Sequence, residues 1–250
     1  MSGTVHIQNV GDQIVVLEID NPPMNPLGGP MLATFMRALD QVEADERLRA
    51  IVVTGRGRAF CSGADLKDTG KDGEDIGGFG RLLERLDAAR APVIAAVNGW
   101  CVGGGFELAL CCDIRIASSE AKFVCAGVNM GLMASAYRLP RLIGVSRAKA
   151  MLLTGLPHDA ETAERYGLVT ALHVPDDLRA AALALAERIA SRAPLSVEAT
   201  KRVAGRAPDL SPLDAAAMQA EEMQVLRRSN DHQAALAAFR EKRDPVFTRS

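Results

Sequence analysis

Glu107 follows three consecutive glycines, Gly103, Gly104 and Gly105, where the apolar run Val93–Val97 has given way to a helix-forming segment. Glycine permits positive φ angles and the close approach of a ligand, and the first turn of a helix leaves N–H groups without partners inside the helix. Such N–H groups suit an oxygen that gains negative charge during a reaction. A carboxylate within one turn of them, flanked by apolar residues, predicts an enzyme active site in which Glu107 moves a proton.

A second glycine-bearing segment, FCSGADLK at residues 60–67, follows a short apolar run at residues 51–54. Its backbone N–H groups are also available at the end of a strand. Neither segment contains a G-x-G-x-x-G or G-x-x-x-x-G-K-[ST] pattern, so neither matches a nucleotide-binding motif. Taken alone, each cluster fits a plain tight turn better than a site.

The composition limits the class of protein. With 250 residues, of which 48% are hydrophobic and 24% charged, the chain can bury a full core as one large domain or as a domain with an appendage. The formal net charge of −2 gives no basic field, so no nucleic-acid partner is expected. No apolar run reaches the roughly 20 residues of a membrane span, and the first residues lack the features of a signal peptide. We therefore expect a cytoplasmic protein with no membrane partner.

Cysteine and histidine usage argues against disulfides and metals. The five cysteines are an odd number and lie mainly in apolar surroundings, which favours reduced, buried thiols. The four histidines are scattered, and the sequence holds neither an H-x-x-x-H pair nor a C-x-x-C pair. We expect no metal site.

The hydrophobic pattern predicts alternating strands and helices up to about residue 190. The expected elements are a hairpin of strands at 5–9 and 13–19, a helix from Pro30, strands at 50–54, 93–97, 114–117 and 122–124, a loop at 55–80 and a helix at 81–89. The ββα-like recurrence of these elements indicates an α/β core of stacked turns over residues 1–190.

After Ser146 the pattern becomes mainly helical. Helices are expected at 147–153, 160–166, 176–191 and 231–242, and a strand at 168–174. Residues 191–250 are therefore expected to form a helical C-terminal region. Because so small an appendage has little apolar area to bury by itself, it should pack on the core or on a neighbouring subunit.

Together, in this order and spacing, the two glycine segments resemble the crotonase, or enoyl-CoA hydratase/isomerase, superfamily. The resemblance rests on FCSGADLK and PVIAAVNGWCVGGGFELALCCDIRIAS, and it continues through RLPRLIGVSRAKAMLLTG, AERYGLV and FREKRDPVF, so it covers essentially the whole chain. It implies a crotonase-like α/β spiral of ββα turns whose helical C-terminal region assembles homotrimers, often paired into hexamers. It also implies an acyl-CoA thioester as the substrate and partner.

Carried onto this sequence, the resemblance assigns the catalytic positions. The backbone N–H groups of Ala64 and Gly104 would form an oxyanion hole for an enolate-like thioester oxygen, and Gly105 would let the turn pass close to the thioester. Glu107 would be the first of the two glutamates that act as acid and base in the hydratases.

The resemblance also implies contacts with coenzyme A. The residues concerned are Met24, Ser62, Ala64, Asp65, Leu66, Lys67 and Lys242. The backbone of residues 62–66 would receive the adenine, the two lysines would lie near the phosphates, and Met24 would border the CoA arm. For the lysines, an ordinary solvated charge is an equally good interpretation. Coenzyme A would arrive as part of the substrate, so no separate cofactor is expected.

One position departs from the family. Counting from Cys112-Asp113 without a gap, the second glutamate of the hydratases falls at Gly127, and no Asp or Glu occurs in residues 121–146. Adding water across a C=C bond requires one group to take a proton from water and one to deliver a proton to the α-carbon. Here Glu107 must serve both steps or use an uncharged partner. The candidate partners are Asn129, Ser135 and Tyr137.

Four nearby residues could be given a chemical role by type alone. We expect Asp113 and Arg115 to be structural residues at a helix-to-strand turn. Cys125 is expected to be a small buried residue rather than a thiolate. Trp100, the only tryptophan, is expected to pack below the acyl pocket.

The sequence leaves three functions open. The first is an enoyl-CoA hydratase or isomerase that uses Glu107 with an uncharged partner. The second is another crotonase-type acyl-CoA reaction, such as thioester hydrolysis, decarboxylation or dehalogenation. The third is an acyl-CoA-binding protein without turnover. The retention of Glu107 favours an enzyme over a binding protein.

Overall fold

The computed structural model describes residues 3–65 and 76–250. Within these residues, six strands form the larger sheet, in the spatial order β1 (Thr4–Val10), β2 (Ile14–Asp20), β4 (Ala50–Gly55), β7 (Val93–Val97), β9 (Ile114–Ser118) and β12 (Leu172–His173). β1 and β2 form an antiparallel hairpin in which Thr4 pairs with Asp20. Every later strand joins this sheet in parallel.

A second sheet lies beside the first. Counted over the described residues it has four strands, in the order β11 (Pro157–Asp159), β10 (Lys122–Val124), β8 (Trp100–Val102) and β5 (Ala59–Cys61). A third, two-stranded sheet pairs β3 (Pro26–Leu27) with β6 (Gly63–Ala64).

Successive strands alternate between the larger sheet and the second sheet, so the chain follows a spiral path. The pairs β4–β5, β7–β8 and β9–β10 each give one strand to the larger sheet and the next to the second sheet. After the first two pairs come the helices α2 (Ile76–Asp87) and α3 (Gly104–Cys111). The expected α/β spiral of ββα turns is therefore confirmed.

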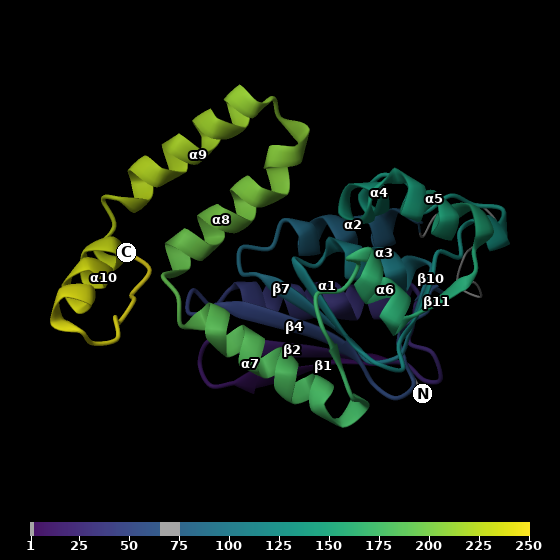
Figure 1. Cartoon of the computed structure of the whole chain (residues 1–250). Coiled ribbons are helices and arrows are strands. Elements are labelled where there is room, and N and C mark those ends of the chain that lie inside the picture. Colours follow the sequence, from purple (N-terminus) through teal and green to yellow (C-terminus); the bar gives the residue numbers. More distant parts are fainter. Residues whose placement is uncertain (1–2, 66–75) are drawn as a thin grey trace.

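The larger sheet separates two hydrophobic clusters. Successive side chains of a strand point to opposite faces, so alternate residues of β4 belong to different clusters. Val53 joins the main core, which also contains buried residues of α1 (Gly29–Glu43), α2 and α3, whereas Val52 packs in a cluster with α7 (Leu178–Ala190). Figure 1 shows α7 lying across one face of the sheet. Because both faces are covered, the parallel strands are nearly unbroken apolar runs.

The remaining helices complete the chain. They are α4 (Arg138–Ile143), α5 (Val145–Thr154), α6 (Ala160–Tyr166), α8 (Pro194–Arg206), α9 (Pro212–Leu226) and α10 (Asn230–Glu241), with short 3₁₀ helices η1 (Val128–Met130), η2 (Pro175–Asp177) and η3 (Ala207–Asp209). In Figure 1, α8 and α9 extend away from the sheets, and α10 lies at the far end from α4 and α5. No helix within residues 3–65 and 76–250 has the length and apolarity needed to cross a membrane.

One sequence expectation about elements was wrong. The expected loop at 55–80 contains β5, β6 and the start of α2, because strands of two or three residues are too short to show a period. The sequence predicted no element at the position of α4, which contains Pro140. Proline is tolerated there because it lies in the first turn, where an N–H has no partner inside the helix.

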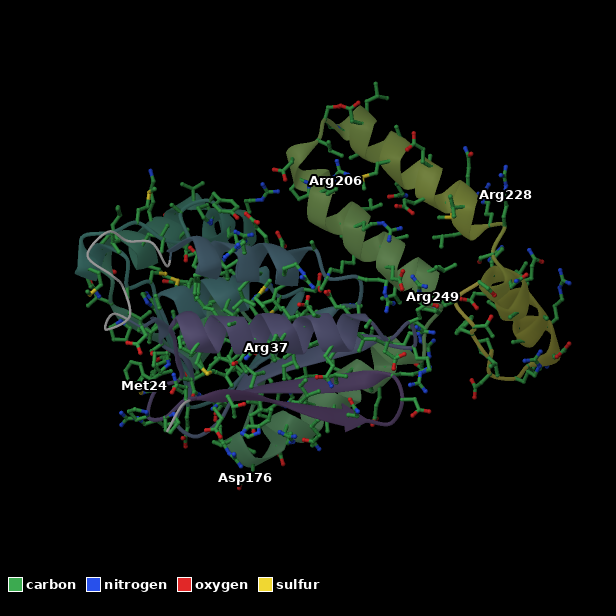
Figure 2. All side chains as sticks on the ribbon, turned by 180° about the vertical axis from the view of Figure 1, so that it is seen from behind. Met24, Arg37, Asp176, Arg206, Arg228 and Arg249 are labelled. Atoms are coloured by element: carbon green, nitrogen blue, oxygen red, sulfur yellow. The ribbon has the colours of Figure 1, made fainter. Side chains whose placement is uncertain are left out.

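Glu198 on α8 links the C-terminal residues to the core through hydrogen bonds. Its side chain is 7% exposed and accepts hydrogen bonds from Arg249 Nε at 2.9 Å and from Arg90 Nη1 at 3.0 Å. Asp231 on α10, 1% exposed, accepts the N–H groups of Thr248 and Arg249. These bonds tie the last residues to α8 and α10, at the end of the molecule opposite Met24 (Figure 2).

We expect Arg249→Met to lower the free energy of unfolding by about 1–3 kcal/mol at pH 7, because the Glu198 carboxylate stays buried with one partner fewer. Burial acts to raise the pKa of Glu198, but the hydrogen bonds from Arg249 and Arg90 outweigh it and hold this pKa below its ordinary value of 4.5. A lowered carboxyl pKa contributes stability above about pH 4.5 that is lost as the pH falls through the folded-state value.

Urea unfolding of the two proteins across this pH range measures the effect. The difference between them should be present at pH 7 and shrink below pH 4.5. Arg228→Met, at an exposed position, is the control and should change stability little. A difference that does not depend on pH would contradict the role given to Glu198.

Candidate active site

The helix α3 presents Glu107 in its first turn. Gly103, just before the helix, has a φ of 53°, and its carbonyl accepts the Glu107 N–H at 3.1 Å. The N–H of Gly104 stands at the first helical position, where no carbonyl inside the helix can accept it. Phe106 and Leu108 are fully buried on either side of Glu107, so the helix cannot rotate without disrupting the core.

Two glycine segments meet at the start of α3. A Cβ on Gly63, whose φ is 89°, would lie 2.5 Å from Gly104 N. A Cβ on Gly105 would lie 2.0 Å from Cys61 O. Real Cβ atoms essentially never approach backbone this closely, so these glycines allow α3 to pack directly on β5 and β6. The close contact with the Cys61 carbonyl gives Gly105 a packing role; its expected closeness to the thioester stays a prediction.

Ala64 is held beside Gly104 by the small β3–β6 sheet. Leu27 pairs with Ala64, and the N–H of Asp65 donates to Leu27 O at 3.2 Å. Two residues before Ala64, the N–H of Ser62 donates to Met24 O at 3.0 Å. The loop that carries Met24 therefore borders the segment of Ser62, Ala64 and Asp65, and its contact with coenzyme A stays a prediction.

A cavity of about 400 Å³ opens in front of these residues. Ala64, Asp65, Gly104 and Glu107 all line it. The rest of its wall is mainly apolar and consists of Leu27, Leu32, Phe79, Gly80, Leu83, Leu132, Met133, Ala134, Tyr137 and Arg138. The cavity thus combines the Glu107 carboxylate and a helix N-terminus with a mainly apolar wall, which suits proton transfer beside the carbonyl of an apolar acyl group.

The two oxygens of Glu107 have different surroundings. Oε1 accepts a hydrogen bond from the Ser135 N–H. Among the described residues, Oε2 has no hydrogen-bond partner, and neither does the buried hydroxyl of Ser135. One oxygen is therefore fixed by the backbone and the other is left for chemistry.

Gly127 lies at the start of η1, where the backbone is crowded. A Cβ there would come within 2.9 Å of Ala134 N and 3.1 Å of Leu132 O. The position expected for a second glutamate therefore has no room for a side chain unless the segment 132–134 moves.

Other predicted residues fall outside this cavity. Leu66 and Lys67 lie outside the described residues. Lys242 ends α10, far from the cavity within one chain (Figure 1). Trp100 was expected below the acyl pocket, which was wrong: it stands on β8, 38% exposed, and is not part of the cavity wall.

Asp113 and Arg115 have structural contacts, as predicted. Asp113 accepts the Val93 N–H at 2.7 Å and pairs with Lys201 at 2.8 Å. Arg115 is 5% exposed and donates to the carbonyls of Leu168, Ala109 and Cys112.

All five cysteines are free and buried, as expected. Burial raises the pKa of the Cys125 thiol to about 12, with the nearby Glu107 charge as a smaller cause, so this thiol stays protonated. The described residues contain no group of three His, Cys, Asp or Glu side chains that could hold a metal ion.

Sequence reasoning missed the aromatic and aliphatic wall contributed by α2. Phe79 Cζ would lie 2.7 Å from a Cβ on Gly104, so the Phe79 ring covers the start of α3. The signal for Phe79 and Leu83 was present, since they are four residues apart on one helix face. The helical pattern could not show that the face carrying Phe79 and Leu83 packs against the start of α3.

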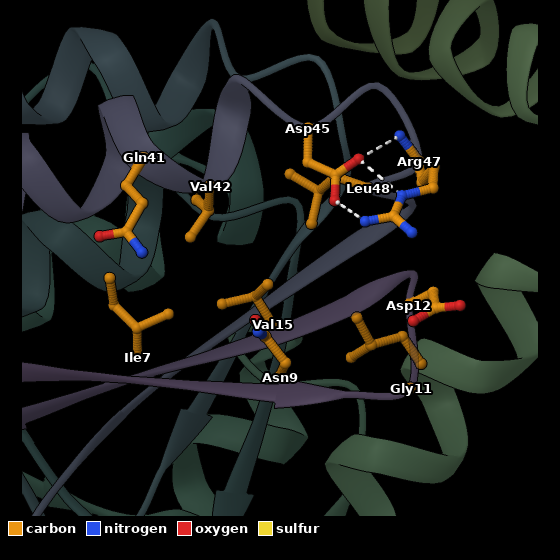
Figure 3. A pocket seen from close by; sticks show the side chains of 11 residues that line it. Ile7, Asn9, Gly11, Asp12, Val15, Gln41, Val42, Asp45, Arg47 and Leu48 are labelled. Carbon is orange, nitrogen blue, oxygen red and sulfur yellow. Dashed lines mark hydrogen bonds and ion pairs between the residues drawn. The ribbon is translucent and has the colours of Figure 1, made fainter.

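Another cavity, of about 210 Å³, lies between the β1–β2 hairpin and the end of α1 (Figure 3). Its charged pair, Asp45 and Arg47, is mutually hydrogen-bonded, with Arg47 Nη2 2.9 Å from Asp45 Oδ2. Asp12 also lines this cavity but is exposed to solvent, so within the described residues the cavity holds no buried, unpaired acid comparable with Glu107 Oε2.

Comparison with known proteins gives a consistent result along the whole chain. A family model described as enoyl-CoA hydratase/isomerase matches residues 9–250. A probable enoyl-CoA hydratase of Mycobacterium bovis is 40% identical, over 98% of this chain and 92% of the relative. An (E)-benzylidenesuccinyl-CoA hydratase of Thauera aromatica is 37% identical, over 95% and 96%. A solved enoyl-CoA hydratase from Bacillus anthracis superposes with a TM-score of 0.96 at 30% identity, covering 99% of this chain and 100% of that one.

The close approach at Gly105 predicts that Gly105→Ala lowers the free energy of unfolding by about 1–3 kcal/mol or more, because the new Cβ would overlap Cys61 O and push α3 away from β5. Gly80→Ala is the matched control: Gly80 is also helical, and nothing lies within 4 Å of its added Cβ. That variant should be neutral or stabilised by up to about 1 kcal/mol. Equal stability of the two variants in urea unfolding would contradict the packing described for Gly105.

Proposed function

The chain is an enzyme of the enoyl-CoA hydratase/isomerase family. We propose that its cavity of about 400 Å³ binds an acyl-CoA thioester and that Glu107 moves a proton beside the thioester carbonyl. One observation carries the proposal. Glu107 Oε2 has no partner among the described residues and belongs to an apolar cavity that Ala64 and Gly104 also line.

The backbone N–H groups of Ala64 and Gly104 are proposed to hold the thioester oxygen. When a proton leaves or joins the carbon beside a thioester, negative charge develops on this oxygen. Donors fixed in advance stabilise that charge without reorganising, and removing one such donor typically costs about 2.7–4 kcal/mol of transition-state stabilisation. Support comes from the tight packing of Gly63 on Gly104, which leaves neither donor segment free to move.

A single carboxylate is sufficient for isomerisation. The same oxygen can take a proton from the α-carbon of a 3-enoyl thioester and return it to the γ-carbon. Hydration needs, in addition, a group that holds water. The resemblance implies a second glutamate where this chain has Gly127, so we propose that Glu107 works here with an uncharged partner.

The acyl group is proposed to be apolar. Tyr137 and the aliphatic side chains of the cavity offer it van der Waals contact, and the carboxylates of Glu107 and Asp65 would repel a negatively charged acyl group. Coenzyme A would run past Met24 and the backbone of Ser62 to Asp65, and no separate cofactor is proposed.

We propose that copies of this chain assemble as a homotrimer or as a hexamer of two trimers. The helices α9 and α10 carry large apolar side chains that are exposed to solvent. Leu213 and Phe239 are 80% and 84% exposed, and Val225 is 64% exposed. Exposed apolar patches of this kind mark interaction surfaces. Because Lys242 is far from its own cavity, any contact with a CoA phosphate would come from a neighbouring copy. We place the protein in the cytoplasm.

We expect Glu107→Gln to lower kcat by about 10²–10⁴-fold, because the amide cannot accept the transferred proton. The control is Glu187→Gln, at an exposed position on α7. Products from crotonyl-CoA and from a 3-enoyl-CoA would be measured by mass spectrometry, and binding of a non-hydrolysable acyl-CoA thioether by calorimetry. Binding should change little. Unchanged turnover in Glu107→Gln would refute the proposal, and tight binding without any product from the unaltered protein would indicate a binding protein.

The proposed assembly predicts that Phe239→Glu shifts the chain toward monomers, since a charge would have to be buried where an exposed aromatic ring now meets its partner. Sedimentation velocity checks this. Arg240→Glu, which changes the charge at the next position, is the control and should leave the assembly largely intact. A monomeric unaltered protein would contradict the assembly directly.

A further inference from the structure

Two buried polar atoms of the site lack a hydrogen-bond partner among the described residues: Glu107 Oε2 and Ser135 Oγ. Ser135 is only 3% exposed. Buried polar groups without partners are rare and destabilising, so each one in a native structure requires an explanation. The residues that carry these two atoms are in direct contact.

A hydrogen bond joins Ser135 and Glu107. The Ser135 N–H donates to Glu107 Oε1. Within a serine, Oγ can lie no farther than about 4 Å from its own backbone nitrogen, given standard bond lengths. The Ser135 hydroxyl therefore lies near the Glu107 carboxylate, where one water molecule bonded to both groups would satisfy them.

The backbone of Ser135 is unusual for a residue with a side chain. Its φ is 60°, in the left-handed region that glycine adopts freely and other residues rarely do. Its carbonyl accepts the Leu139 N–H at 3.1 Å, which anchors it to the start of α4. Glycine would give the same backbone bonds without strain, so a serine at this position points to a use for its hydroxyl.

We propose that Ser135 Oγ is the uncharged partner of Glu107 and holds, together with Glu107 Oε2, the water that adds to the β-carbon of an enoyl thioester. The inference rests on the proposed function and deepens it. As the water oxygen bonds to the β-carbon, the π electrons move to the thioester oxygen and one water proton passes to Oε2. Glu107 then returns that proton to the α-carbon, so the added hydrogen and hydroxyl both come from one water.

The other uncharged or weakly acidic candidates are engaged elsewhere or unsuited. Asn129 lies on η1, and its Nδ2 donates to Gly155 O at 2.9 Å. Tyr137 is 62% exposed, with the Arg138 guanidinium 4.6 Å from the centre of its ring. Cys125 keeps its proton because burial raises its pKa to about 12. Of these neighbours, Ser135 alone combines burial with an unpaired hydroxyl in the described structure.

The experiment uses Ser135→Ala and Ser135→Gly in the full-length protein. The first removes only the hydroxyl, the second removes the strain as well, and both keep the N–H that holds Oε1. Two rates are measured for each: hydration of crotonyl-CoA, and exchange of the α-protons of butyryl-CoA in D₂O followed by NMR. Exchange needs Glu107 and the oxyanion hole but no added water. Ala136→Gly, at the exposed neighbouring residue, controls for loop flexibility.

Both Ser135 variants should lose about 10- to 100-fold in hydration, the effect expected for one hydrogen bond in a site containing a charge. Their α-proton exchange should stay within about twofold of the unaltered protein, and Ala136→Gly should change neither rate. Hydration at the unaltered rate in both variants would overturn the proposal. So would equal loss of both rates, which would mean a disturbed site rather than a lost water holder.

The two rates of the unaltered protein test the proposed function and the role of Ser135 separately. Exchange without hydration would leave Glu107 as the proton carrier but overturn the water-holding role of Ser135. Absence of both reactions would overturn the proposed function, and this role with it.

Discussion

The packing of the start of α3 on β5 and β6 is the constraint on which the site depends. Gly63, Gly104 and Gly105 bring two backbones into direct contact, so that a Cβ on Gly105 would lie 2.0 Å from Cys61 O. The spiral makes this contact possible because β5 and β8 pair in parallel, with Cys61 opposite Cys101, and both lead into the site. Where the two segments touch, Ala64 and Gly104 line one cavity together with Glu107, which lies in the first turn of α3.

The sequence predicted the parts of this arrangement that depend on local pattern. The hairpin, the helices at 160–166 and 231–242, and Glu107 in the first turn after three glycines were visible because each is a property of a few consecutive residues. Contacts between distant segments were not visible. Nothing near Gly105 shows that its space is filled by Cys61 O, and nothing near Trp100 shows that β8 turns its ring toward solvent. Ser135 was one of three candidates, and only its burial and strained backbone distinguish it from Asn129 and Tyr137.

The site is unfavourable for folding, and the rest of the chain offsets it. An unpaired buried polar group typically costs about 1–3 kcal/mol. Within the described residues no protein group satisfies Glu107 Oε2 or Ser135 Oγ, so both depend on water or substrate for a partner. The flanking Phe106 and Leu108 are fully buried, and they hold α3 in place through the main core. The apolar wall has a second effect, since charges interact more strongly where water is scarce. Stability is therefore supplied by the layers around the cavity, while the cavity itself retains unsatisfied groups that a substrate can engage.

The crowding at Gly127 has a consequence for the history of such a protein. A Cβ at this position would come within 2.9 Å of Ala134 N and 3.1 Å of Leu132 O, and both obstacles are backbone atoms. A mutation to glutamate therefore meets a loop that must first change its path. Gaining an acid here takes at least two coordinated changes, and the substitution made first, in the present loop, folds less well than its parent.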